Sequence, residues 1–256
     1  MRLFHRDLGG DGRPPLLLLH GFLGSSRNWQ TAGRDLAARH HVYALDLRNH
    51  GDSPHADLMS HAVLAEDVLA WLDWRGIPAA TVLGHSLGGK VAMLLACRQP
   101  ERIVRLVVVD IAPRDYRHPE RRAEFAAMNA LDLAELPSRA EAERRMAADV
   151  PDWAMRKFLL TNLERTPEGG WRWSINLPVL ARSAAALEAN PLRPVDRCDG
   201  PALFLAGGKS RYIGADDAAV IRRHFPAAQL VTLPESGHNP HIDAREAFVR
   251  AVDAFV

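Results

Sequence analysis

The alternation of strand-like and helix-like patterns over the first 110 residues constrains the fold more than any other feature of this chain. Short apolar runs, which suit strands buried on both faces of a sheet, occur at residues 16–19, 42–47, 80–83 and 103–109. Stretches with a helical spacing of apolar residues separate them, at residues 28–39, 61–74 and 87–97. Strands that alternate with helices in this way predict a parallel sheet with helices on both faces.

From residue 113 to about residue 190 the alternation stops, and no run there predicts a buried strand. Helix-like stretches take its place, at residues 121–131, 138–149, 153–163 and 178–189. Ser138 and Glu141 fit a capping box, with Glu141 reaching back to the N-cap residue. The strand–helix alternation then returns, at residues 202–206, 216–224, 229–233 and 244–256. We therefore expect an α/β core of residues 1–112 and 191–256 and a helical cap of residues 113–190.

The composition excludes several classes of function. The 32 Lys and Arg residues nearly balance the 31 Asp and Glu residues, so no nucleic-acid partner that needs a broad basic surface is expected. The two cysteines, Cys97 and Cys198, form no C-x-x-C pair, which excludes a zinc ribbon and a thioredoxin-like motif. No secretory signal and no apolar run of membrane-spanning length is visible, so we expect a cytoplasmic protein without a membrane partner.

The twelve histidines raise the question of a metal site. Neither H-E-x-x-H nor H-x-H occurs, so we expect no metal and no other cofactor. A nearly neutral chain suits a small-molecule substrate, and we expect a monomer or a small homo-oligomer.

The segment Gly84-His85-Ser86-Leu87-Gly88-Gly89 contains a G-x-S-x-G motif between an expected strand and an expected helix, which is the context the motif requires. The serine has to sit on a tight, strained turn, where a side chain at Gly84 or Gly88 would collide with neighbouring backbone. This turn lifts the hydroxyl of Ser86 above the sheet edge, and the start of the helix favours negative charge beside it. Ser86 is therefore the candidate nucleophile.

Two loops at the same sheet edge offer partners for Ser86. The segment His20-Gly21-Phe22-Leu23-Gly24 follows the first strand, so the backbone N–H groups of Phe22 and Leu87 are candidates for an oxyanion hole, although an ordinary turn also fits. His238 follows the last expected strand, and a general base has to project from this edge. His241 lies nearer the final helix, and we expect it to be structural.

Together these segments resemble the α/β-hydrolase superfamily over the whole chain, on the residues His20-Gly21-Phe22, 46–53, 84–89 and Gly237-His238. A narrower similarity, to the YbfF-type esterases, is carried by residues 48–51, 110–113 and 170–173. The resemblance implies a mostly parallel eight-stranded sheet with a cap inserted after its sixth strand. It also implies hydrolysis of short- to medium-chain acyl esters, and possible activity on acyl-CoA thioesters.

The acid expected to orient His238 is not at the position usual for the superfamily. Most of the superfamily carries it after the strand expected at residues 202–206, but Ser210 occupies that position here, and a hydroxyl cannot replace a carboxylate. Asp110 ends the neighbouring strand, and the YbfF-type pattern also has an Asp there. Alternatively, Asp110 only anchors the insertion, and Asp216 or Asp217 is the acid. We expect Asp46 and His50 to be structural.

The expected activity is that of a carboxylesterase-type serine hydrolase. Tyr116 lies close to Asp110 in the sequence and Tyr212 lies in the opposite loop, so both are candidates for binding the acyl group of the substrate. A carbon–carbon bond hydrolase or lyase of the same fold, acting on a small carboxylated substrate, is the main alternative. A third hypothesis is a non-catalytic protein that binds a small molecule.

Overall fold

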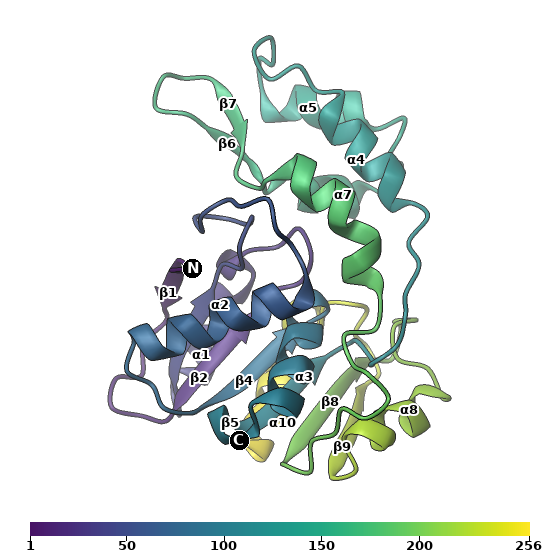
Figure 1. Cartoon of the computed structure of the whole chain (residues 1–256). Helices are drawn as coiled ribbons and strands as arrows, with labels where there is room; N and C mark the ends of the chain where they lie inside the picture. Colours follow the sequence, from purple (N-terminus) through teal and green to yellow (C-terminus); the bar gives the residue numbers. More distant parts are fainter.

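The computed structural model describes residues 1–256 and contains a seven-stranded sheet of order β1-β3-β2-β4-β5-β8-β9 (Figure 1). Edge strand β1 runs antiparallel to β3, and all the other pairs are parallel. The strands are β1 (His5–Asp7), β2 (Pro15–Leu19), β3 (His41–Leu45), β4 (Ala80–His85), β5 (Ile103–Val109), β8 (Ala202–Gly207) and β9 (Ala228–Leu233). The expected fold class, a mostly parallel sheet flanked by helices, is confirmed.

The sheet has seven strands where eight were expected. β1 is an edge strand whose one neighbour is β3, so no eighth strand pairs with its outer side. The insertion consequently follows β5, the fifth strand in chain order rather than the sixth.

Alternate residues of the strands pack into separate cores on the two faces of the sheet. Leu17 and Leu19 of β2 point to the face covered by α2 (His61–Trp74) and α3 (Leu87–Arg98). Leu16 and Leu18 point to the opposite face, where the helices α1 (Gln30–Leu36) and α10 (Arg245–Phe255) contribute to the core. This two-residue period is what a strand buried on both faces requires. Two further helices complete the core, α8 (Asp217–His224) and α9 (Pro240–Asp243), and two short 3-10 helices cover Ser26–Trp29 and Pro100–Arg102.

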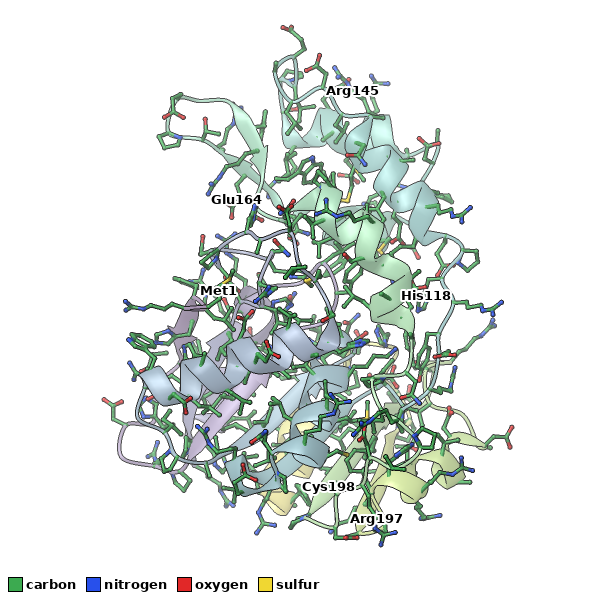
Figure 2. The ribbon with its side chains drawn as sticks, in the orientation of Figure 1. Met1, His118, Arg145, Glu164, Arg197 and Cys198 are labelled. Atoms are coloured by element: carbon green, nitrogen blue, oxygen red, sulfur yellow. The ribbon has the colours of Figure 1, made fainter.

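Residues between β5 and β8 form a separate group of elements beyond one end of the sheet (Figure 1). Arg145 lies in its outer part, whereas His118 lies where the chain leaves the sheet region (Figure 2). The elements are α4 (Arg121–Asn129), α5 (Arg139–Met146), α6 (Trp153–Leu160), β6 (Leu163–Arg165), β7 (Trp171–Trp173) and α7 (Leu177–Glu188). The division of the chain at residues 112 and 191 stays a prediction.

Two local details of the insertion differ from expectation. The helix expected at residues 153–163 ends at Leu160, and an antiparallel hairpin of β6 and β7 follows, turning at Gly169 with a φ of 87°. Ser138 does cap α5 by accepting a hydrogen bond from the N–H of Glu141 at 3.1 Å. The Glu141 carboxylate does not reach back, because it binds Arg144 and Arg145 instead.

The parallel strands present their carboxyl ends at one edge of the sheet. The residues that follow β2, β4, β5 and β9 are therefore close neighbours, although they are far apart in sequence. No helix of the chain combines the length and the apolar character needed to span a membrane.

Candidate active site

Ser86 occupies a strained turn between β4 and α3. Its φ is 49° and its ψ is −113°, a conformation that side-chain-bearing residues rarely adopt. A Cβ on Gly84 would collide with the carbonyl of Gly88, and a Cβ on Gly88 would collide with the carbonyl of Leu19. Hydrogen bonds from Ser86 N to Val109 O (3.1 Å) and from Lys90 N to Ser86 O (3.0 Å) hold the turn in place. The two glycines therefore have the role expected from the motif.

The loop after β2 lies directly against this turn. A Cβ on Gly21 would be 3.3 Å from the Cβ of Ser86, and the N–H of Gly88 donates to His20 O at 3.1 Å. The N–H of Phe22 makes no hydrogen bond within the protein, and Leu87, as the first residue of α3, has no acceptor within the helix. Phe22, Ser86 and Leu87 line one cavity.

His238 and Asp110 are hydrogen-bonded at the same sheet edge. The distance from His238 Nδ1 to Asp110 Oδ2 is 2.8 Å. Because a carboxylate only accepts, Nδ1 carries the hydrogen, and Nε2 keeps its lone pair available for a proton. Asp110 is fully buried, and its carboxylate also accepts from Gly207 N at 3.0 Å and from the hydroxyl of Ser210.

The structure does not bring the alternative acids to His238. Asp217 binds Arg114 at 2.8 Å and accepts from the N–H of Gly214 at 2.7 Å, whereas Asp216 is an exposed residue at the start of α8. His241 packs on Trp29 with ring centroids 4.3 Å apart, and burial lowers its pKa to about 3. His241 therefore belongs to the protein interior and stays neutral.

Tyr212 and His85 contact His238 from different elements. The ring of Tyr212 stacks on the imidazole with centroids 3.6 Å apart and an interplanar angle of 14°. His85, the residue before Ser86, donates from Nε2 to the carbonyl of His238 at 2.8 Å. These contacts fix both the ring and the backbone of His238 relative to the turn that carries Ser86.

Tyr116 has a structural task in addition to its expected place near the substrate. Its hydroxyl donates to Tyr212 O at 2.6 Å and accepts from Ala112 N at 2.8 Å, so it joins the start of the insertion to the loop after β8. Burial raises the pKa of the Tyr116 hydroxyl, which therefore stays protonated, and Tyr116 also lines the cavity beside Ser86.

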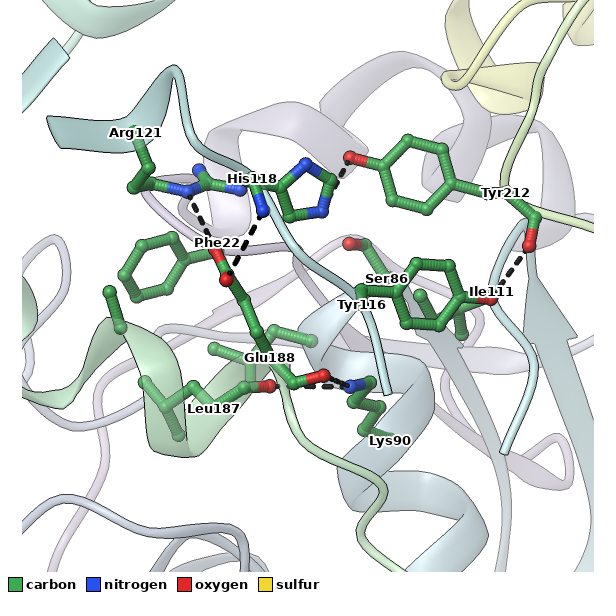
Figure 3. Close-up of a pocket in the computed structure, with 12 residues that line it drawn as sticks. Phe22, Ser86, Lys90, Ile111, Tyr116, His118, Arg121, Leu187, Glu188 and Tyr212 are labelled. Atoms are coloured by element: carbon green, nitrogen blue, oxygen red, sulfur yellow. Dashed lines mark hydrogen bonds and ion pairs between the residues drawn. The ribbon is translucent and has the colours of Figure 1, made fainter. Parts of the chain in front are cut away.

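A cavity that is partly open to solvent lies beside Ser86 between the sheet edge and the insertion (Figure 3). Seven of its twelve lining residues are hydrophobic, including both expected tyrosines. Across the cavity Arg121 binds Glu188 at 3.3 Å, and its guanidinium lies 4.9 Å from the ring centroid of Phe22.

The lining residues that the sequence did not single out are Lys90, Ile111, His118, Arg121, Ala184, Leu187 and Glu188. Most of these belong to α7 or to the segment before α4, where no motif marks them. Lys90 is different, because it lies four residues after Ser86, and this helical spacing alone predicts that it lies near Ser86.

The segment 46–53 supports the loop that carries Phe22. His50 accepts from Leu23 N at 3.3 Å and donates from Nδ1 to Arg48 O at 2.9 Å. Arg48 in turn forms a buried bidentate ion pair with Asp67, at 2.5 and 2.8 Å. One group of possible metal ligands, Asp7, Asp11 and His41, lies at the opposite edge of the sheet, where β3 begins.

Comparisons with known proteins agree with the fold. The family described as alpha/beta hydrolase fold matches residues 14–245. The sn-1-specific diacylglycerol lipase ABHD11 of Mus musculus is 37% identical over 99% of this chain and 85% of the relative. Esterase YbfF of Escherichia coli is 34% identical, covering 94% of this chain and 92% of the relative. A solved structure named as a marine microorganism esterase superimposes with a TM-score of 0.95 at 34% identity over all of both chains.

Proposed function

Because the chain belongs to the alpha/beta hydrolase fold family, we propose that it hydrolyses carboxylic esters of short- to medium-chain acyl groups through an acyl-enzyme on Ser86. Relatives named as esterases and lipases, aligned over nearly the whole chain, support a hydrolase acting on esters. The observation that carries the serine mechanism is the hydrogen bond between His238 and Asp110 at the edge where Ser86 sits on its strained turn.

The proposed reaction has two steps. The oxygen of Ser86 attacks the acyl carbonyl while Nε2 of His238 takes the hydroxyl proton. The bond from the acyl carbon to the leaving oxygen then breaks, and the leaving alkoxide receives that proton. Water attacks the acyl-enzyme in the second step, with His238 again as the base, and releases the carboxylic acid and free Ser86.

Two charges have to be stabilised in this mechanism, the negative charge of the oxyanion and the positive charge of His238. The N–H groups of Phe22 and Leu87 donate to the oxyanion of each tetrahedral intermediate, and such a donor typically contributes about 10²–10³ in rate. Asp110 orients His238 and stabilises its positively charged form. The rings of Tyr116 and Tyr212 form part of the wall that faces the acyl group.

A fluorophosphonate probe tests the nucleophile. The folded wild-type protein should be labelled at Ser86, and Ser86→Ala should not be labelled, because the probe reacts with activated serines. Absence of labelling in folded wild-type protein would contradict the serine mechanism and favour a non-catalytic binding protein.

A panel of p-nitrophenyl esters and acyl-CoA thioesters of increasing chain length tests the substrate class. We expect turnover of the short- and medium-chain esters, and the thioesters decide whether the same acyl-enzyme forms from a sulfur leaving group. A labelled protein that is inactive on every ester but cleaves a vinylogous keto-acid would replace ester hydrolysis with carbon–carbon bond hydrolysis.

A further inference from the structure

Lys90 lies on α3 one helical turn after Ser86, and its side chain ends at the carboxyl end of α7 (Figure 3). The residue is only 2% exposed. Its ammonium donates to the carbonyls of Glu188 at 2.5 Å, Ala189 at 2.6 Å and Leu187 at 3.4 Å. All three donors of the ammonium are thus directed at one helix end, which comes from the insertion.

The carboxyl end of a helix suits such a group. Its last carbonyls have no partner within the helix, and the aligned peptide dipoles give this end a partial negative charge. Burial nevertheless disfavours the ammonium and lowers the pKa of Lys90 to about 8. The charges of Asp115 and Glu188 partly offset this effect without a direct ion pair to Lys90, and the ring of Tyr116 is 5.0 Å away. Burying a cation that has no direct ion pair is a costly way to hold a helix end, which points to a role beyond stability.

The held end of α7 is also a wall of the candidate active site. Ala184, Leu187 and Glu188, all in its last turns, line the cavity beside Ser86. Two other donors bind the same carbonyls: His61 Nε2 to Leu187 O at 3.0 Å, and the N–H of Tyr116 to Glu188 O at 2.9 Å. Without the ammonium, the carbonyl of Ala189 loses its donor while the other two carbonyls keep theirs. The expected consequence is a looser last turn rather than loss of the fold.

We propose that Lys90 is a positioning residue that sets the acyl-chain selectivity of the enzyme by holding the carboxyl end of α7 against the helix that carries the nucleophile. The inference rests on the proposed ester hydrolysis at Ser86. A rigid last turn of α7 limits the depth of the cavity and favours short acyl groups. A turn that moves away from α3 makes room for longer ones.

Lys90→Met tests the proposal, because methionine fills a similar space without a charge or a donor. The matched control is Arg98→Met, the same kind of substitution on the same helix, at a residue that is partly exposed and does not line the cavity. The measured quantity is the ratio of kcat/KM for p-nitrophenyl octanoate to that for p-nitrophenyl acetate. We expect Lys90→Met to raise this ratio about tenfold and Arg98→Met to change it by less than about twofold. Hydrogen exchange of residues 184–190 should become faster in Lys90→Met only.

An unchanged ratio in folded Lys90→Met would overturn the proposal, even if exchange in α7 became faster. If Lys90→Met does not fold, Lys90→Arg is measured instead, because arginine keeps a cation for the carbonyls. The octanoate-to-acetate ratio of Lys90→Arg should rise by less than tenfold but by more than that of Arg98→Met. A ratio equal to that of the wild type would again overturn the proposal. Fluorophosphonate labelling of each variant distinguishes a failure of the serine mechanism from a failure of the role proposed for Lys90. Loss of labelling in the wild type contradicts the serine mechanism, whereas labelling with an unchanged ratio contradicts only the role of Lys90.

Discussion

Asp110 has to be held by its surroundings, because it is fully buried and has a positive φ of 50°. His238 supplies one donor to its carboxylate, and Gly207 and Ser210, from the end of β8, supply two more. The loop in which most of the superfamily carries the acid thus provides donors to an acid on the neighbouring strand. These three donors hold the Asp110 carboxylate in one orientation towards His238.

The acid assignment predicts unequal effects for two Asp→Asn variants. Asp110→Asn should lower kcat on p-nitrophenyl acetate by about 10³–10⁴, because an amide can donate to Nδ1 and thereby favours the wrong tautomer of His238. Asp216→Asn is the control, since Asp216 is exposed at the start of α8. Near-normal turnover in Asp110→Asn, combined with a large loss in Asp216→Asn, would reduce Asp110 to an anchor of the insertion.

The residues of the candidate site could be predicted from the sequence to different degrees. Ser86 and His238 were predicted from a motif and from the strand order, and Asp110 from the replacement of the usual acid by Ser210 together with the resemblance to the YbfF-type esterases. Arg121 and Glu188 carry no such signal, since they face the cavity only through the packing of α4 and α7. That packing depends on contacts between segments far apart in the chain, which a local pattern does not report.

At the scale of elements, the turn between β4 and α3 has to fit closely against the end of β2. The contact is between backbones, because the site of a Cβ on Gly88 is already filled by the carbonyls of Leu19 and His20. The periodic parts of these elements were predictable from their apolar spacing. The β6–β7 hairpin was not, because each of its strands has only three residues, too few for an alternation such as Trp171-Arg172-Trp173 to predict a strand.

Gly88→Ala tests the close fit at this turn. The added methyl group meets backbone that cannot rotate away, so we expect a loss of about 1–3 kcal/mol in the free energy of unfolding, measured by urea titration. Gly200→Ala is the control, because a Cβ there would be 3.5 Å from the Sγ of Cys198, an ordinary contact. Equal stability of the two variants would show that β2 and α3 can separate without cost.

At the scale of the whole molecule, several histidines are buried as neutral groups. His20 accepts from Leu47 N at 3.0 Å and His50 accepts from Leu23 N, so protonation of either ring would break a buried hydrogen bond. Burial is the main cause that lowers the pKa of His20 to about 4 and that of His50 to about 3. His61 is a third case, with its pKa lowered to about 4 by burial and then by the nearby Lys90. Stability of the fold is therefore linked to pH through groups that do not take part in the proposed reaction.

This linkage predicts a loss of stability in mild acid. Because the folded pKa values lie below the unfolded value of 6.5, the unfolded chain binds more protons between about pH 6.5 and pH 4, and the free energy of unfolding falls as the pH falls through this range. Each histidine with a folded pKa near 4 contributes about 2 kcal/mol of this loss at pH 5. Urea titrations at pH 7 and pH 5 measure it. His61→Gln keeps a donor for Leu187 O but removes one titrating group, so its stability should decline less between the two pH values. Equal stability of the wild type at both would mean that these histidines are protonated in the folded state, and that their hydrogen bonds rearrange to accept the charge.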